Sequence, residues 1–283
     1  MSHDAAELAP RKDHKQENFP VASFIIKRRH RAAIMAFYRF ARTADDVADH
    51  PSLSSDARLA QFERMRATLA GETDDDTVSF ALRRTIEDRG LDAGHALDLL
   101  AAFRRDVVKS RYADWAELMD YCRYSAAPVG RQLLDLHGET RAAWPASDAL
   151  CAALQVLNHL QDCAADYRAL DRVYLPLADL AAAGCAVEVL SAPAASPGLR
   201  QVLDTMLDRT ETLIATARGL PPEVAARGLR WESAVIVALA ARLARRLRRG
   251  DPLARRVKLA NSDFAAAFLT GILVRPLLSR HRT

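Results

Sequence analysis

Apolar residues recur along most of the chain with the spacing of one helix face, and alternating runs of Val, Ile and Thr are scarce. Because positions three and four apart share a side of a helix, this pattern predicts helices and argues against sheets. Proline, glycine and helix-capping residues divide the pattern into segments. The predicted helices span residues 21–49, 56–70, 75–89, 93–108, 114–137, 198–218, 221–249 and 252–278, and one more starts at Ser147 or Asp148.

Turn residues set the expected boundaries of these helices. Ser54 or Ser55 can cap the second helix, and the helix over 114–137 should be kinked at Ala127-Pro128. The segment after Asp166 is predicted to be an ordered loop. No fixed repeat or convincing linker marks a domain boundary. We therefore predict an all-α fold, with a single domain over residues 18–283 behind a polar tail, residues 1–17.

Composition agrees with a large helical core. Of the 283 residues, 50% are hydrophobic and only 6% are aromatic. The four cysteines show no CxxC spacing and the N-terminus has no apolar stretch, so we expect free thiols, no signal peptide and a cytoplasmic protein. The longest apolar run near the end, residues 264–274, is shorter than the ~20 residues that span a bilayer.

Two segments place polar residues along one face of an otherwise apolar helix. In residues 37–49 the stripe carries Tyr38, Arg42, Asp45 and Asp49. In residues 155–166 it carries Gln155, Asn158, Asp162 and Asp166. Like charges one helical turn apart repel, so something positive should compensate. Carboxylates with carboxamides form an all-oxygen ligand set that suits Mg²⁺ or Mn²⁺, and a solvated face is the alternative for either pair.

The net charge of +4 is unevenly distributed, because residues 242–258 contain eight basic side chains and one acid, Asp251. A solvated helix face is the simplest interpretation. Attraction to an anionic membrane or to phosphates is the alternative. Nucleic acid binding is not expected, since no interleaved aromatic residues or recognisable reader module accompany the arginines.

Several common catalytic motifs are absent from the sequence. It has no GxxxxGK[ST], GxGxxG, HExxH or GxSxG, and no Glu-x-x-His pair of a di-iron bundle. We interpret all eight histidines as structural or surface groups, including His159, which adjoins the second stripe.

Three stretches together resemble the signature motifs of the squalene/phytoene synthase family, in the family's order: FYRFARTADDVAD, YCRYSAAPVG and NHLQDCAADYRALDRVYLP. With the opening ENFPVAS they cover residues 18 to about 176. ENFPVAS and SAAPVGR are further similar to the bacterial branch that makes hydroxysqualene for hopanoid synthesis. The resemblance implies an isoprenoid-synthase-type helical bundle around a central active-site cavity.

The resemblance also implies roles for individual residues. Five would hold Mg²⁺ ions that bridge to a substrate diphosphate: Asp45, Asp49, Asp162, Asp166 and Asn158. Four would bind the diphosphate: Arg42, Arg172, Asn18 and Gln155. Tyr121 would handle a proton or cation, and Phe19 and Tyr38 would line the pocket, with core packing as the alternative for these two rings. Arg256 aligns less clearly with a C-terminal diphosphate contact, and Ala48 and Ala165 replace acids that many members carry.

The reaction implied is the ionisation of presqualene diphosphate, rearrangement of the carbocation and capture by one water, which needs no NADPH. An apolar cavity would protect the cation, and the candidates for its wall are Met35, Phe37, Phe40, Leu134 and Leu157. One alternative is a head-to-head prenyltransferase that makes presqualene diphosphate, squalene or phytoene-type products from farnesyl diphosphate or its relatives. Another is a non-catalytic helical adaptor that contacts membranes through its basic C-terminal region. The apolar product favours hand-off at the surface of the inner membrane.

Overall fold

The computed structural model describes residues 28–274, and the side chains of residues 28–269. Helices form nearly all of its regular structure, and the β bridge in the described part joins Arg111 and Val173. The all-α prediction is confirmed. In chain order the helices are α1 (Arg28–Ala48), α2 (Ser55–Leu69), α3 (Thr77–Arg89), α4 (Gly94–Val108), α5 (Trp115–Ser125), α6 (Ala127–Leu136), the 3₁₀ helix η3 (Arg141–Ala143), α7 (Trp144–Leu170), α8 (Leu177–Ala182), the 3₁₀ helix η4 (Val187–Ser191), α9 (Pro197–Ala217), α10 (Leu220–Glu223), α11 (Arg227–Arg249) and α12 (Asn261–Val274).

The chain divides into two compact units. The first contains residues 28–109 and 131–138, and the second contains residues 110–130 and those from 139 onward. Helix α6 begins in the second unit and ends in the first. The expectation of a single domain stays a prediction.

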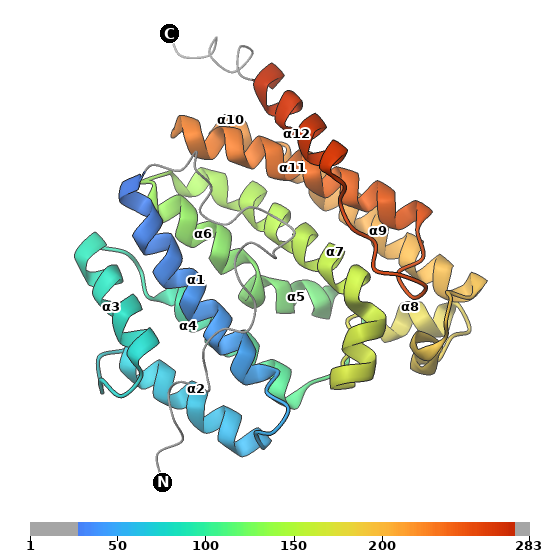
Figure 1. Cartoon of the computed structure of the whole chain (residues 1–283), viewed down its shortest axis with the longest axis horizontal. Helices are drawn as coiled ribbons and strands as arrows, with labels where there is room; N and C mark the ends of the chain where they lie inside the picture. Colours follow the sequence, from blue (N-terminus) through green and yellow to red (C-terminus); the bar gives the residue numbers. More distant parts are fainter. Residues whose placement is uncertain (1–27, 275–283) are drawn as a thin grey trace. The chain divides into compact units, whose positions relative to one another are not determined.

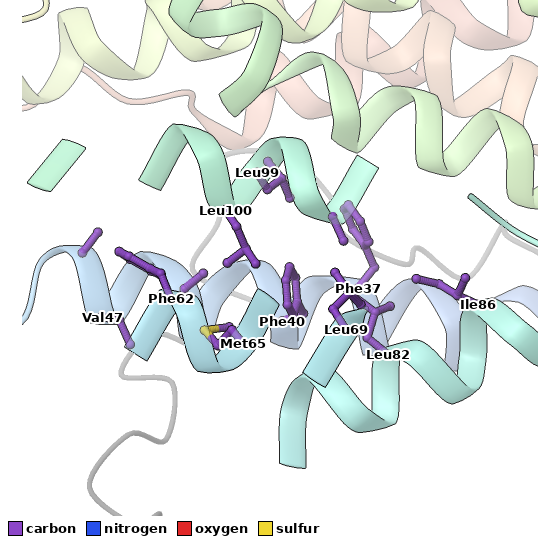
Figure 2. Close-up of a cluster of buried hydrophobic side chains, with 13 residues drawn as sticks. Phe37, Phe40, Val47, Phe62, Met65, Leu69, Leu82, Ile86, Leu99 and Leu100 are labelled. Carbon is purple, nitrogen blue, oxygen red and sulfur yellow. The ribbon is translucent and has the colours of Figure 1, made fainter. Parts of the chain in front are cut away.

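In the first unit, α1 packs against α3 and α4, and α2 packs against the same two helices (Figure 1). Buried side chains recur every three or four positions along α1 and meet those of the other three helices (Figure 2). The large core residues are Phe37, Phe40, Phe62, Met65, Leu69, Leu82, Ile86, Leu99 and Leu100. Full burial of each stabilises the fold by roughly 1.5–3 kcal/mol. Core packing therefore accounts for Phe37 and Phe40, two of the candidates for a cavity wall.

In the second unit, α7 packs against α5, α9 and α11, and α11 packs against α12. Gly130 lies where the start of α6 closes on α7. A Cβ atom at this position would be 2.4 Å from the Ser147 Oγ and 2.7 Å from the Cys151 Sγ. The glycine of the SAAPVG stretch thus has a packing role.

Local chemistry explains the element boundaries that were predicted correctly and one that was not. The Ser54 hydroxyl accepts a hydrogen bond from the Ala57 N–H at 3.2 Å and caps α2, as predicted. The expected kinked helix over 114–137 is instead two helices. Ala126 leaves helical geometry, with φ −122° and ψ −49°, and Pro128 stands in the first turn of α6, where its missing N–H costs nothing.

Three other boundaries differ because tertiary contacts or prolines decide them. Helix α7 begins at Trp144, earlier than predicted, with Pro145 in its first turn, and it continues to Leu170. Helix α11 begins six residues late, because the N–H groups of Ala225 and Ala226 donate to the Glu139 carboxylate. Helix α12 begins at Asn261, after an irregular loop over residues 251–260. The predicted helix start at residue 21 and helix end at residue 278 lie outside the described residues.

The cysteine prediction is confirmed: the four cysteines, all within the described residues, are free thiols. Within residues 28–274, no helix is both long and apolar enough to cross a bilayer.

Candidate active site

The first aspartate pair lies at the C-terminal end of α1. Asp45 is in the last turn, and the N–H of Asp49 donates to the Asp45 carbonyl at 3.0 Å, so the helical turn brings the two together. The Arg42 guanidinium donates to the Asp45 carboxylate at 2.5 Å and to Asp46 at 3.5 Å. Arg42 is therefore the positive group that the sequence pattern required beside this pair.

Asp45 sits in a strongly acidic environment. Burial raises its pKa from the ordinary 3.8 to about 7, Asp49 adds to the rise, and Arg42 opposes it. Asp46 and Asp106 raise the pKa further. The Asp45 side chain is nevertheless 36% exposed, so a cation in solution can reach it. At Asp45 the lowering effect of Arg42 therefore does not outweigh burial and the neighbouring carboxylates.

Asp106, from α4, was missed in the sequence. It is buried, with 8% of its surface exposed, and it is the acid on the apolar face of that helix. An acid among buried positions at helical spacing is a signal that could have identified it.

The second pair lies on α7, where Asn158, Asp162 and Asp166 are all half-buried, as is Gln155 one turn before them. The Arg256 guanidinium holds Asp162 through both oxygens, with Nε 2.6 Å from Oδ1 and Nη2 2.7 Å from Oδ2. This fork geometry is the one in which arginine binds carboxylates and phosphates best. Arg256, whose alignment in the sequence was less clear than that of the other candidates, is thus in direct contact with Asp162 of the second aspartate pair.

Tyr121 of α5 belongs to a buried cluster of aromatic rings in the second unit. Its ring centroid lies 5.2 Å from that of Tyr112, 5.6 Å from that of Tyr174 and 6.2 Å from that of His159. His159 stacks on Tyr174 at 3.5 Å. Burial, and then Arg172, lower the pKa of His159 to about 3, so its imidazole is neutral.

Arg172 follows the end of α7 and is itself buried, with 7% of its surface exposed. Two features fix this segment. Asp171 takes a left-handed conformation, with φ 48°, and its carboxylate accepts a hydrogen bond from Arg111 at 2.5 Å. The adjacent Val173 N–H donates to the Ser110 carbonyl at 2.8 Å. The chain from Arg172 to Tyr174 is therefore held along residues 110–112.

The site residues predicted from the sequence fall into three groups. In the first unit, Tyr38, half-buried on α1, Arg42, Asp45 and Asp49 follow one stripe. The second unit contains Tyr121, Gln155, Asn158, Asp162, Asp166 and Arg172. Asn18 and Phe19 lie outside the described residues.

The donor chemistry of both pairs fits magnesium. Within residues 28–274, no group of three or more His, Cys, Asp or Glu side chains could hold a metal ion, so each pair supplies part of a shell. One or two carboxylates are the usual protein share for Mg²⁺, with waters and substrate phosphates completing the octahedron. The raised pKa of Asp45 marks a place where a further positive charge would be stabilised.

Comparison with known proteins agrees with these features. The squalene/phytoene synthase family model matches residues 12–263. Two relatives are named hydroxysqualene synthase: one from Rhodopseudomonas palustris, 50% identical over 93% of this chain and 90% of its own, and one from Sinorhizobium fredii, 48% identical over 89% and 87%.

A solved structure is also similar. The crystal structure of squalene synthase HpnC from Alicyclobacillus acidocaldarius matches with a TM-score of 0.70 at 34% identity, covering 86% of this chain and 92% of that one. The similarity therefore extends over nearly the whole sequence and includes the helical fold. The chain belongs to the squalene/phytoene synthase family.

Proposed function

We propose that this protein converts presqualene diphosphate into hydroxysqualene, in a Mg²⁺-dependent reaction of hopanoid biosynthesis that uses no NADPH. The observation that carries this proposal is the identity of about one half to two hydroxysqualene synthases over about nine tenths of each chain. The four aspartates, at the end of α1 and on α7, would hold the metal ions that loss of a diphosphate requires.

The two aspartate pairs and Asn158 would hold the Mg²⁺ ions. Bound Mg²⁺ would neutralise charge on the leaving diphosphate as the C–O bond breaks. Arg42 and Arg172 would contribute guanidinium groups to diphosphate binding, with Gln155 and Asn18 as hydrogen-bonding partners. His159 beside Arg172 is neutral, so Arg172 is the cation of the two that would attract the anion.

The aromatic cluster in the second unit would protect the carbocation. The faces of Tyr121 and its neighbours Tyr112 and Tyr174 carry the negative side of the ring quadrupole, which attracts a positive charge. All three side chains are buried, so bulk water is excluded from around them. We assign pocket-lining roles to Tyr38 and Phe19 as well.

A second candidate is condensation of two prenyl diphosphates, and the similar solved structure is that of a squalene synthase. The same carboxylates and arginines would serve that reaction. A non-catalytic adaptor would not need both aspartate pairs, and the chain has all four carboxylates.

Product analysis separates these functions. Purified protein with Mg²⁺ and no reductant is given presqualene diphosphate in one tube and farnesyl diphosphate in another. We expect hydroxysqualene from the first tube alone, and none when EDTA replaces Mg²⁺. Turnover of farnesyl diphosphate would instead indicate a condensing synthase, and no product in either tube would contradict both enzymatic functions.

Single substitutions make this assay specific for the proposed site. We expect Asp45→Asn and Asp162→Asn each to lower kcat/KM by about 10²–10³-fold, because each removes a carboxylate that would hold the Mg²⁺ neutralising the leaving diphosphate. Asp75→Asn changes an exposed aspartate of the first unit and should leave the rate unchanged. Equal rates for all three variants would contradict the assignment of the aspartates.

We also propose a cytoplasmic location with peripheral contact at the inner membrane, because the product is very apolar. Phe268 and Leu269 of α12 expose apolar surface, with 36% and 61% accessible. Co-sedimentation with lipid vesicles at low and high salt tests this contact, and no pelleting at either salt would contradict it.

A further inference from the structure

The basic segment of the sequence does not form a uniformly solvated helix face. Arg242, Arg245, Arg246 and Arg249 follow one stripe of α11, at i, i+3, i+4 and i+7. With the loop before α12, this stripe lines an open cavity of about 630 Å³ (the two helices are shown in Figure 1). The loop contributes Arg255, Arg256, Val257 and Lys258 to the lining, and α12 contributes Asp263.

Contacts with neighbouring elements hold this loop over the arginine stripe. Gly250 lets it turn back on α11, since a Cβ atom there would be 2.8 Å from a methyl group of Val257. The Gln161 side chain of α7 donates to the Val257 carbonyl at 2.5 Å. Arg256 forms an ion pair with Asp162, which also lies on α7. The cavity is therefore a built feature of the fold.

Negative charge in the cavity is far too scarce to match the positive charge. Seven cationic side chains line it, and Asp263 is the acid among them. Asp263 is already engaged, accepting from the Arg246 Nε at 2.5 Å and the Ala260 N–H at 2.8 Å. These contacts hold its pKa below the ordinary value although burial alone would raise it.

Apart from Arg246 and Arg256, the cations of the cavity have no such partner. Among the described residues, Arg245, Arg249, Arg255 and Lys258 form no ion pair, and the Arg242 Nε is buried without a hydrogen-bond acceptor. Arg248 lies outside the lining of the cavity and is paired with Asp208 at 2.7 Å and Glu211 at 3.1 Å. Arg248, on the same helix but outside the cavity, thus pairs with carboxylates, whereas most of the cations lining the cavity do not.

The helix dipole explains only part of this arrangement. Cations are favoured in the last turn of a helix, which accounts for Arg246 and Arg249. Arg242 lies about two turns before the end, and Arg255 and Lys258 are not on the helix, so the dipole does not act on them. A bound anion would stabilise the whole set.

We propose that this cavity is a binding site for a phosphate-bearing anion, which the guanidinium groups of Arg242, Arg245, Arg249 and Arg255 engage. Several guanidinium groups around one cavity suit a phosphate, because each planar group can donate two parallel hydrogen bonds to a pair of phosphate oxygens. The phosphate is either a free diphosphate or the headgroup of an anionic phospholipid. Arg256 connects the site to Asp162, so an anion in the cavity lies beside an arginine that touches the second aspartate pair.

Calorimetric titration with inorganic diphosphate in EDTA tests the site without metal or substrate. Its result is therefore independent of whether the chain turns over presqualene diphosphate. We expect the double variant Arg245→Ala/Arg249→Ala to bind diphosphate at least tenfold more weakly than the natural chain. Both side chains are exposed, so the variant should fold. The control Arg218→Ala/Arg227→Ala removes the same charge from exposed positions of the same unit outside the cavity and should change binding less than twofold.

A parallel experiment identifies a lipid source of the phosphate. Vesicles of phosphatidylglycerol are compared with vesicles of phosphatidylcholine by co-sedimentation. Selective pelleting with phosphatidylglycerol that Arg245→Ala/Arg249→Ala abolishes and the control retains supports the site with a lipid headgroup as its ligand. Selective loss of diphosphate binding alone supports it with a free anion. If the two double variants behave alike in both experiments, or if the natural chain binds neither probe, the proposal is overturned.

Discussion

At the scale of single residues, Asp45 shows how a carboxylate suited to catalysis costs stability. Its pKa is about 7 in the folded chain and 3.8 ordinarily, so folding disfavours its ionised form and stability falls as the pH rises from about 4 to 7. Since its side chain is 36% exposed, solvent screening reduces this cost to about 1 kcal/mol. We expect Asp45→Asn, measured in EDTA, to raise Tm by about 2–4 °C at pH 8.

The pH dependence distinguishes this effect from a general change in packing. The gain in Tm should shrink towards zero as the pH falls to 4, where the natural carboxyl is protonated in the folded chain. Asp75→Asn, at an exposed position, should show no such trend. Thermal unfolding followed by circular dichroism at pH 4, 6 and 8 measures both variants, and a lower Tm for Asp45→Asn at pH 8 would refute the account.

Residues whose roles depend on local spacing could be predicted, and those that depend on distant contacts could not. The two aspartate stripes are patterns within about three turns of one helix, so the 3.6-residue period is enough to place them. Arg256 lies 94 residues from Asp162, and no local pattern relates them. Asp106 acts on Asp45 from another helix, which again only the fold reveals.

At the scale of helices, Gly130 sets the approach of α6 to α7. Alanine is favoured over glycine within a helix by about 1 kcal/mol, so propensity alone predicts that Gly130→Ala is stabilising. The new Cβ atom would, however, be 2.4 Å from the Ser147 Oγ, and overpacking typically costs about 1–3 kcal/mol. We expect packing to dominate, with a net loss of up to about 2 kcal/mol and a Tm lower by up to about 8 °C.

A second substitution tests the cause of that loss. Ser147→Ala removes the atom nearest to the new methyl group, so it should restore part of the stability of Gly130→Ala. On its own it should have a smaller effect. Denaturant unfolding of the two single variants and the double variant gives the coupling free energy, and a stabilising Gly130→Ala would show that the two helices do not meet this closely.

Helix boundaries were predictable where capping side chains set them. The side chains of Ser54 and Asp76 cap α2 and α3, and both helix starts were placed within one or two residues. Residues 252–260 were predicted to be helical from their apolar spacing, but the structure uses their backbone and side chains to bind α7, through Val257 and Arg256. Tertiary contacts override a weak helical preference there.

At the scale of the whole molecule, sequence composition indicated the charge of the basic segment but not its shape. Eight cations in 17 residues predict a positive surface wherever the segment folds. That the segment folds back on itself depends on Gly250, whose neighbours are known only from the structure. The same cations would be screened individually on a flat helix face, whereas they act together in a cavity.

The unfolding of the chain tests whether its two units behave as one domain. All three tryptophans, Trp115, Trp144 and Trp231, belong to the second unit, so their fluorescence reports on that unit alone. Helical circular dichroism at 222 nm reports on both.

Helix α6 connects the two units. Its residues 127–130 belong to the second unit and residues 131–136 to the first, and the chain passes from one unit to the other three times. If either unit unfolds, one end of α6 therefore loses the residues that it packs against, although the other end belongs to the folded unit. We expect the two signals to give the same midpoint in urea, as a single cooperative transition requires, and separated midpoints would establish two independently stable domains.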